Sequence, residues 1–600
     1  MIRESIRNRW TEIGIRACRE CGLVVLIWVA VAWGVPGPQN AAAADTPRRP
    51  NVILIMADDQ GFGDLSLHGN TKLQTPHLDT LAAQGIELTD FHVSPVCAPT
   101  RASLMTGRYH YRTRVVDTAF GRAMMDPAEI TLAEMLGGAG YQTGIFGKWH
   151  LGDNYPLRPM DQGFGESLVL RGGGIGQPSD PPGGSSYFDP ILLHNGQLEK
   201  TSGYCSDVYT RAAVQFIERH QAEPFFVYLA FNAPHTPLEV PDEYRARYSS
   251  MRLDRGEFPN AGFPLSDKID QDTTARVYGM VANIDDNVGR LLHRLDELHL
   301  ADDTIVVFLT DNGPQQERFK SGLRGLKGTV YEGGIRVPCF LRWPGKFAAG
   351  RKIDRLAAHI DLAPTLLAAC RVPRPAEAVC DGRSLLPQLL GESPDWPDRT
   401  LYFQWHRGDA PDLNRACAAR SQRWKIVQPQ GTAPGPAPAN PAFELYDMAA
   451  DHYELHNVAA EHPEIVQAMR AGYEAWFREV GAARGYAPPR IVLGSKHENP
   501  VTLTRQDCRT GWGDKDVGSW EVDVAAPGDY QIKVTFRKPT TGIARLRLGD
   551  AALDQPISGE ATQVVFDRIA LTAGPAPLTA WSARGEQKTG AWFVDVRRIE

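Results

Sequence analysis

Four side chains that carry oxygen ligands follow two apolar segments and could hold a hard metal ion. Asp58 and Asp59 come directly after "NVILIMA", and Asp311 and Asn312 come directly after "DTIVVFLT". Carboxylates gathered in one place repel one another unless a cation neutralises them. Oxygen ligands without a His/Cys set are typical of calcium or magnesium sites rather than zinc or copper sites. The alternative is that these side chains cap the turns or helices that follow the two segments.

Five basic side chains elsewhere in the chain could bind an oxyanion. Lys148 and His150, in "GKWHLG", alternate along an extended segment and would point to one face. His235 follows the apolar run "PFFVYLAF", and Lys327 lies in a glycine-rich loop that permits close approach to a ligand. Arg101 adds a planar donor group that matches an oxyanion. Each of these residues alone is more often structural, but together with a cation they indicate a pocket for a tetrahedral dianion.

The segments before these residues predict the fold that positions them. The three apolar runs, near residues 51, 225 and 304, are typical of strands buried on both faces. Amphipathic patterns such as "EITLAEMLGGAG" and "RVYGMVANIDDNVGRLLHRLDEL" predict helices between them. We therefore expect an α/β fold with a mostly parallel central sheet flanked by helices. Ligands of such sheets gather at the carboxyl ends of the strands, where "ADD", "NAPH" and "TDNG" would lie.

Two further segments could border the same edge. The Gly/Pro-rich stretch 171–190, "RGGGIGQPSDPPGGSSYFDP", predicts a long loop that either frames the site or is a surface excursion. His406, in "QWHRGD", is a candidate for lining the pocket from a more C-terminal segment. Both would influence which leaving group the site accepts.

The pattern of apolar and polar residues changes after the predicted catalytic domain, 45–395, and changes again near residue 488. Short strand patterns and an amphipathic helix from near His462 predict a smaller α+β subdomain over 396–487. Alternating apolar and polar residues between turn signals predict an additional β-sandwich over 488–600. Trp512, Trp520 and Trp592 in this sandwich either stack on sugar rings or fill its core.

The first 44 residues are typical of a signal peptide. Arginines precede the apolar run "GLVVLIWVAVAWGV", which ends in the small-residue tract "NAAAAD". The run is short for a membrane span, so we expect export to the periplasm or the extracellular space and no stable membrane span in the mature chain, with an uncleaved anchor as the alternative. A net charge of −7 and a pI near 6.2 argue against nucleic acid as a partner.

An odd number of cysteines follows the predicted signal peptide: Cys97, Cys205, Cys339, Cys370, Cys380, Cys417 and Cys508. In an oxidising compartment one of the seven would be unpaired or chemically altered. Cys370 and Cys380 are close enough in sequence to close a small loop, and we predict a disulfide between them. Cys97, followed at once by Ala-Pro-Thr-Arg, is the candidate for the altered residue.

The order of these motifs resembles the type I sulfatases, the formylglycine-dependent, arylsulfatase-like members of the alkaline phosphatase superfamily. "CAPTRASLMTGR" matches their Cys-x-Pro-x-Arg signature, and "GKWHLG" matches their second signature. The succession of "ADDQG", "CAPTR", "GKWH", "NAPH", "TDNG" and "LKG" extends the resemblance over roughly residues 50 to 345. It implies an alkaline phosphatase-like fold and a secreted sulfuric ester hydrolase that acts on a sulfated small molecule or glycan.

The resemblance also implies two cofactors. Cys97 would be converted to Cα-formylglycine by a formylglycine-generating enzyme that reads Pro99 and Arg101. The hydrated aldehyde of this residue would be the nucleophile. One calcium ion would be bound by Asp58, Asp59, the modified Cys97, Asp311 and Asn312.

Roles for the basic residues follow from the same resemblance. Arg101 and Lys148 would steady the aldehyde hydrate, and Lys148 would also reach the sulfate. His235, helped by Lys327, would protonate the leaving oxygen. His150 would then take a proton from the second hydroxyl of the hydrate, and sulfate would leave.

Two other functions are compatible with the same residues. A phosphonate monoester or phosphodiester hydrolase of the same superfamily would use the same nucleophile and metal. A non-catalytic glycan-binding protein is the third possibility, although every expected polar position is present. The natural leaving group and the oligomeric state stay open at this point.

Overall fold

The computed structural model describes residues 48–181, 183–392 and 396–599. The predicted signal peptide, residues 1–44, lies outside these residues. Among the helices of the described part, none combines the length and the apolar character needed to cross a bilayer. Residues 48–600 form one compact unit.

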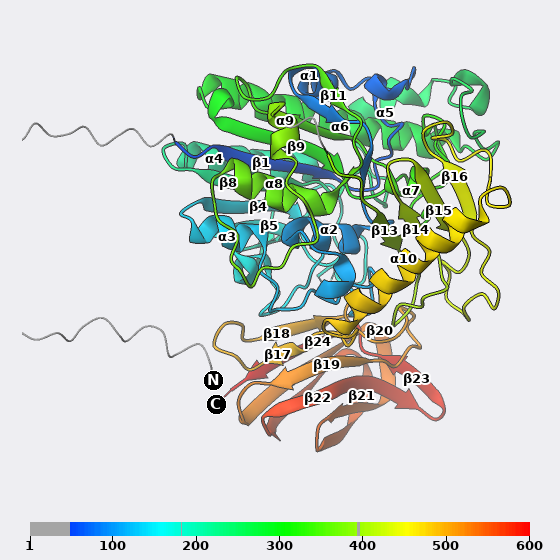
Figure 1. Cartoon of the computed structure of the whole chain (residues 1–600). Coiled ribbons are helices and arrows are strands. Elements are labelled where there is room, and N and C mark those ends of the chain that lie inside the picture. Colours follow the sequence, from blue (N-terminus) through cyan, green and yellow to red (C-terminus); the bar gives the residue numbers. More distant parts are fainter. Residues whose placement is uncertain (1–47, 182, 393–395, 600) are drawn as a thin grey trace, which may run out of the picture. The chain divides into compact units, whose positions relative to one another are not determined.

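A ten-stranded mixed sheet lies at the centre of the N-terminal two thirds of this unit (Figure 1). Its middle strands β9 (Thr304–Thr310), β1 (Asn51–Ala57), β8 (Phe225–Ala230), β4 (Gln142–Lys148) and β5 (Glu166–Leu170) are neighbours in this order and run parallel. The predicted parallel sheet is therefore confirmed. The edges are mixed and comprise β2 (Ile86–Leu88), β10 (Cys339–Arg342), β11 (Arg351–Ile353), β6 (Ile191–His194) and β7 (Gln197–Lys200).

Helices cover both faces of this sheet because its central strands are apolar on both sides. Ile53 and Ile55 of β1 belong to the apolar cluster that includes residues of α1 (Pro76–Gln84), α4 (Cys205–Arg219) and α6 (Gln271–Glu297). Val52 and Leu54 belong to the opposite cluster, which includes residues of α2 (Cys97–Thr106), α3 (Leu132–Gly138) and α8 (Leu362–Ala369). Smaller elements complete this part: α5 (Asp242–Ser249), α7 (Glu332–Ile335), α9 (Leu386–Leu390), the strand pair β3 (Phe91–His92) and β12 (Ala357–Ala358), and 3₁₀ turns at Ser66–His68, His110–Thr113, Pro159–Gln162, Arg255–Glu257, Ala301–Asp303 and His359–Asp361.

A second, four-stranded antiparallel sheet follows. It consists of β13 (Leu401–Gln404), β14 (Cys417–Arg420), β15 (Trp424–Gln428) and β16 (Glu444–Asp447). Helix α10 (Pro463–Ala482) packs on it, and the buried side chains of Tyr473, Trp476 and Val480 share an apolar cluster with Ile426 and Leu445. These are the strands and the helix that the sequence predicts.

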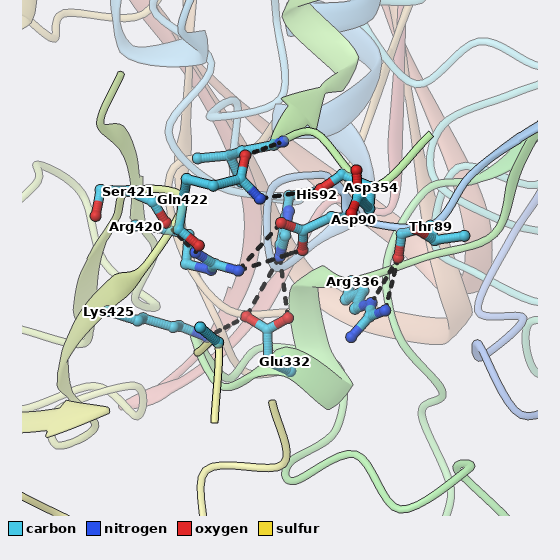
Figure 2. A network of polar contacts seen from close by, with 12 residues as sticks. Thr89, Asp90, His92, Glu332, Arg336, Asp354, Arg420, Ser421, Gln422 and Lys425 are labelled. Carbon is cyan, nitrogen blue, oxygen red and sulfur yellow. Dashed lines mark hydrogen bonds and ion pairs between the residues drawn. The ribbon is translucent and has the colours of Figure 1, made fainter. Parts of the chain in front are cut away.

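A buried ion-pair network joins this second sheet to the first part (Figure 2). Lys425 Nζ, on β15, lies 2.7 Å from Glu332 Oε1 and 2.8 Å from Glu454 Oε1. His92 Nε2, on β3, lies 3.1 Å from Glu332 Oε2. These four side chains are fully or almost fully buried, so each charge depends on its partners for compensation.

The C-terminal β-rich region hydrogen-bonds as one eight-stranded sheet that folds over a single apolar core. Strand β20 (Gly528–Leu548) is shared between its two halves, because residues 530–535 pair with β24 (Phe593–Arg598) and residues 543–548 pair with β22 (Gly574–Arg584). Trp520 is buried in this core. The remaining strands are β17 (Ile491–Leu493), β18 (Val501–Thr504), β19 (Ser519–Val524), β21 (Ala551–Leu571) and β23 (Gln587–Gly590). We call this region the sandwich below; the domain boundaries stay a prediction.

The seven cysteines among the described residues are all free, so the predicted disulfide between Cys370 and Cys380 is wrong. Cys370 ends helix α8 and is buried, with Sγ 4.0 Å from the carbonyl oxygen of Pro50. Cys380 lies against the end of α2, with Sγ 3.1 Å from the carbonyl oxygen of Gly107. The short loop between the two cysteines therefore places their thiols in different surroundings.

Candidate active site

The ends of β1 and β9 bring four oxygen-bearing side chains together. Asp58, Asp59, Asp311 and Asn312 are all fully buried. The backbone N–H of Asp59 donates to Asp311 Oδ1 at 3.2 Å, and Asn312 Nδ2 donates to Asp59 Oδ1 at 2.7 Å. The two strand ends are thus joined through the side chains that the sequence predicts to meet there.

The oxygens that remain fit a hard cation. Asp58 Oδ1, Asp59 Oδ2 and Asn312 Oδ1 are buried and have no hydrogen-bond partner among the described residues. Ligand atoms of Asp58, Cys97 and Asp311 lie within 4.8 Å of one another, and the same holds for Asp58, Asp59 and His235. Buried acceptors without a donor are costly, and oxygen-rich sets of this kind suit Ca²⁺. The donor chemistry of this site therefore fits the calcium ion that the sequence predicts.

Two lysines pair with the carboxylates. Lys148, at the end of β4, forms an ion pair with Asp58, and Lys327 Nζ lies 2.5 Å from Asp59 Oδ1. Burial opposes ionisation of Asp58, but Lys148 and the other cations nearby hold its pKa well below the ordinary value. Burial also opposes the charge of Lys327, but Asp59 raises the pKa of this lysine above its ordinary value. The site therefore keeps closely paired charges of both signs away from bulk water.

Helix α2 presents Cys97 and Arg101 to these groups. Cys97 is the first residue of the helix, and Arg101 lies one turn later on the same face. Arg101 donates from NH2 to Asp311 Oδ2 at 2.8 Å and from NH1 to the carbonyl oxygen of Lys148 at 3.0 Å. Cys97 lines a cavity of about 560 Å³ together with His150, His235 and Lys327.

His150 is held as a neutral ring with one free nitrogen. Its Nε2 lies 2.9 Å from the carbonyl oxygen of Thr118, which can only accept a hydrogen bond, so Nε2 carries the proton. Nδ1 is buried and has no hydrogen-bond partner among the described residues. Burial and then Lys148 hold the pKa of His150 well below its ordinary value. The ring can therefore accept a proton at Nδ1.

His235 is oriented by a similar contact. Its Nδ1 lies 2.7 Å from the carbonyl oxygen of Thr236, so Nδ1 carries the proton, and Nε2 lies 3.9 Å from Asp59 Oδ2. Burial, followed by the charge of Lys327, lowers the pKa of His235 to about 4. His235 and Lys327 thus lie next to the same carboxylate and line the same cavity.

Comparison with known proteins identifies this arrangement. The sequence model of the Sulfatase family matches residues 50–372, more than half of the chain. The chain belongs to the sulfatase family. A second family model, described as N-sulphoglucosamine sulphohydrolase, C-terminal, matches residues 326–475 of this sulfatase. The resemblance predicted from the motifs is thereby confirmed, and the protein is a sulfuric ester hydrolase.

Individual relatives cover most of the catalytic part. Human arylsulfatase A (Homo sapiens) is 32% identical in an alignment of 499 positions, which covers 76% of this sulfatase and 92% of that protein. The N-acetylgalactosamine-6-O-sulfatase of Bacteroides thetaiotaomicron is 31% identical in an alignment of 507 positions, which covers 70% of this sulfatase and 92% of that protein. The crystal structure of Ps i-CgsB in complex with k-i-k-neocarrahexaose has a TM-score of 0.62 at 29% identity and covers 73% of this chain and 95% of that one. The alkaline phosphatase-like fold is thereby supported as well.

The sandwich of this sulfatase contributes Gln506, which sequence reasoning missed, and Trp512 to the site. Gln506 Nε2 donates to the carbonyl oxygen of Thr118 at 2.7 Å and lies 3.3 Å from His150 Nε2. Trp512, a candidate from the sequence, also lines the cavity that holds Cys97. Gln506 follows strand β18 and is 356 residues away from His150 in the sequence. No local sequence motif predicts this contact.

The prediction for His406 is wrong. His406 is buried, its Nε2 accepts a hydrogen bond from the backbone N–H of Asp412 at 2.9 Å, and it does not line the cavity. The residues on either side, Trp405 and Arg407, line the cavity instead. Side chains alternate between the two faces of an extended chain. The sequence therefore indicates the segment that lines the cavity, but His406 lies on the opposite face from Trp405 and Arg407. Gln177, from the predicted framing loop 171–190, lines the cavity too.

Proposed function

We propose that this protein is an exported, calcium-dependent sulfatase that hydrolyses sulfate esters with a formylglycine made from Cys97. The observation that carries the proposal is the position of Cys97 at the start of α2, in one cavity with His150, His235 and Lys327 and within ligand distance of Asp58 and Asp311. A hydrated formylglycine at this position would supply the nucleophile for attack on sulfur. The proposed maturation partner is a formylglycine-generating enzyme that reads "CAPTR".

Asp58, Asp59, Asp311, Asn312 and the modified residue 97 would hold the calcium ion. Bound there, the ion would neutralise negative charge on the sulfate oxygens. This assignment is supported by three buried side-chain oxygens that have no hydrogen-bond partner among the described residues: Asp58 Oδ1, Asp59 Oδ2 and Asn312 Oδ1.

The chain's own residues would orient the ester and move its protons. Arg101 and Lys148, both fully buried, would fix the nucleophilic side chain and the sulfate through charge-assisted hydrogen bonds. His150 would accept a proton at its free Nδ1 when sulfate is released. His235 and Lys327 would stabilise the leaving oxygen and return a proton to it, with Lys327 kept protonated by Asp59.

Sulfated glycans are the substrate class that the relatives support. One relative is named an N-acetylgalactosamine-6-O-sulfatase, and Ps i-CgsB was crystallised in complex with k-i-k-neocarrahexaose. The signal-peptide pattern of residues 1–44 supports export to a compartment where such polymers occur.

Release of inorganic sulfate by the purified protein tests this proposal. We expect hydrolysis of p-nitrophenyl sulfate, and a much lower rate with bis-p-nitrophenyl phosphate under the same conditions. Cys97→Ala should abolish sulfate release while the circular dichroism spectrum stays unchanged. A strong preference for the phosphodiester would instead support the phosphodiesterase alternative, and sulfate release by Cys97→Ala would contradict the assigned nucleophile.

A further inference from the structure

A second cavity adjoins the one that holds Cys97. It has a volume of about 650 Å³ and shares Gln177 and Trp512 with the first. One wall is formed by loop residues within 176–181 and 183–185, and the opposite wall is the sandwich, through residues of β20, β21 and β24 together with Trp592. The two cavities therefore lie next to each other, with Gln177 and Trp512 bordering both.

We infer that this second cavity binds the sugar unit next to the sulfated one, so that the sandwich is part of the substrate site of an enzyme acting on sulfated oligosaccharides. The inference rests on the proposed function, because it takes the first cavity as the sulfate ester site. It assigns the sandwich a role in substrate binding at the active site that a separate surface-docking module would not have.

The sandwich wall has the chemistry of a sugar platform. Trp592 is half-buried, and the guanidinium of Arg537 lies 4.8 Å from the centre of its ring. The backbone N–H of Trp592 donates to the carbonyl oxygen of Thr535 at 2.7 Å, which fixes the residue against β20. Arg537 covers one face of the Trp592 ring, so the remaining indole surface offers the apolar contact for a sugar ring, while Arg537 and Gln563 offer hydrogen bonds to its hydroxyl, carboxylate or sulfate groups.

The wall shared by both cavities is held in place from inside the sandwich. Arg505 is buried and donates from NH2 to the carbonyl oxygen of Asp516 at 2.7 Å and to that of Gly513 at 3.3 Å. These bonds fix the loop that carries Trp512. The ring of Trp512 lies 5.6 Å from that of Phe120, which also lines the first cavity. The position of Trp512 is therefore set by both parts of the molecule.

The sizes of the cavities make the inference testable. Each lies in the range of ordinary ligand sites, about 300 to 1,000 Å³. A small aryl sulfate would occupy only the first cavity, whereas an oligosaccharide would extend past Gln177 and Trp512 into the second. A substitution in the second cavity should therefore affect long substrates and spare short ones.

The first experiment compares Trp592→Ala with Trp581→Ala on two kinds of substrate. Trp581 is the matched control: it is a half-buried sandwich tryptophan with Arg547 5.4 Å from its ring, and it lines neither cavity. With sulfated oligosaccharides such as neocarrahexaose, we expect Trp592→Ala to raise KM about tenfold while kcat changes little. Hydrolysis of p-nitrophenyl sulfate should be unchanged, and Trp581→Ala should match the wild type on both substrates. Equal effects of Trp592→Ala on both substrates, or no effect on either, would overturn the inference.

The second experiment measures binding without turnover, by calorimetry with the desulfated forms of the same oligosaccharides. We expect the wild type to bind at least one of them and Trp592→Ala to weaken that binding about tenfold. Arg537→Ala, at an exposed position, should weaken it less and provides a variant that keeps the fold. Absence of binding to all of them overturns the inference and leaves the proposed function intact. Binding without release of sulfate from any ester contradicts the proposed function and leaves the sugar site standing.

Discussion

At the scale of single residues, the site is an arrangement of opposite charges around oxygens that lack donors. Asp58 and Asp59 each have one carboxylate oxygen paired with a lysine and one that has no hydrogen-bond partner in the described part of the chain. The lysines compensate part of the negative charge, and the free oxygens point to a further positive charge. The structure thus predicts that stability and activity both depend on a metal ion.

Removal of calcium tests this prediction. Treatment with EGTA should abolish sulfate release, and added Ca²⁺ should restore it. At a free concentration of about one hundred times its Kd, Ca²⁺ should raise the free energy of unfolding by about 2.7 kcal/mol, measured in urea. Asp311→Ala should lose this calcium-dependent increase in stability. An unfolding curve that is identical with and without Ca²⁺ would contradict the assignment.

Residues at strand ends could be predicted from the sequence, because an apolar run that stops at Asp58 or Asp311 fixes the place of these side chains in the sheet. His406 could not be placed, because the face of an irregular extended segment depends on its packing. The contact between Gln506 and His150 could not be predicted either, since it joins segments 356 residues apart without a sequence motif.

At the scale of elements, the loop from Gly172 to Gln177 covers both catalytic histidine candidates. A Cβ atom on Gly173 would lie 2.6 Å from His150 Nε2 and 2.9 Å from Gln177 Oε1, and one on Gly174 would lie 3.4 Å from His235 Cε1. The glycines therefore permit backbone to approach the two imidazole rings closely. This explains why the segment predicted as a loop is rich in glycine.

Gly173→Ala should lower kcat by at least about tenfold, because His150 must move away from its contact with Thr118. Gly138→Ala is the matched control, since no atom lies within 4 Å of a Cβ added at this helical position. The control should keep full activity and gain up to about 1 kcal/mol of stability. Steady-state kinetics and urea unfolding of both variants check the prediction; wild-type kcat in Gly173→Ala would contradict it.

The buried ion-pair network around Lys425 joins the four-stranded sheet to the part of the chain that contains the ten-stranded sheet. Lys425→Met removes the shared partner of Glu332 and Glu454 and should lower the free energy of unfolding by about 3 to 5 kcal/mol. Arg423→Met, which removes an exposed pair with Asp447 at 2.8 Å, should leave the free energy of unfolding close to the wild-type value, because water and salt screen an exposed pair. Urea unfolding of the two variants measures both values, and equal effects would refute the buried network as a source of stability.

At the scale of the whole molecule, the sandwich and the catalytic part meet beside the active site. Arg509 NH1 donates to the carbonyl oxygen of Phe120 at 2.8 Å, and Asp507 is buried close to Asp153. Burial and then Asp153 raise the pKa of Asp507 to about 8. Sequence patterns predicted the sandwich as an element, but they did not predict that its loops enter the site, because this depends on packing between distant parts of the chain.

This buried carboxyl predicts a pH dependence of stability. Asp507 has an ordinary pKa of 3.8 and a folded-state pKa of about 8, so the folded state binds more protons between these values. Its contribution to stability is therefore present at low pH and is lost as the pH rises towards 8. Asp507→Asn removes this loss. The free energy of unfolding of the variant minus that of the wild type should therefore increase by roughly 1 kcal/mol for each unit by which the pH is raised from 5 to about 7. Urea unfolding across this range checks it; a constant difference would be inconsistent with the raised pKa.

The central claim is that residue 97 of the active enzyme is formylglycine. Mass spectrometry of the tryptic peptide that spans residues 73–101, taken from protein that releases sulfate from p-nitrophenyl sulfate, tests it most directly. The account predicts that this peptide has the mass of the formylglycine form, and that the modified fraction rises in proportion to the specific activity of different preparations. Fully active protein whose peptide carries an unmodified cysteine at position 97 would contradict it.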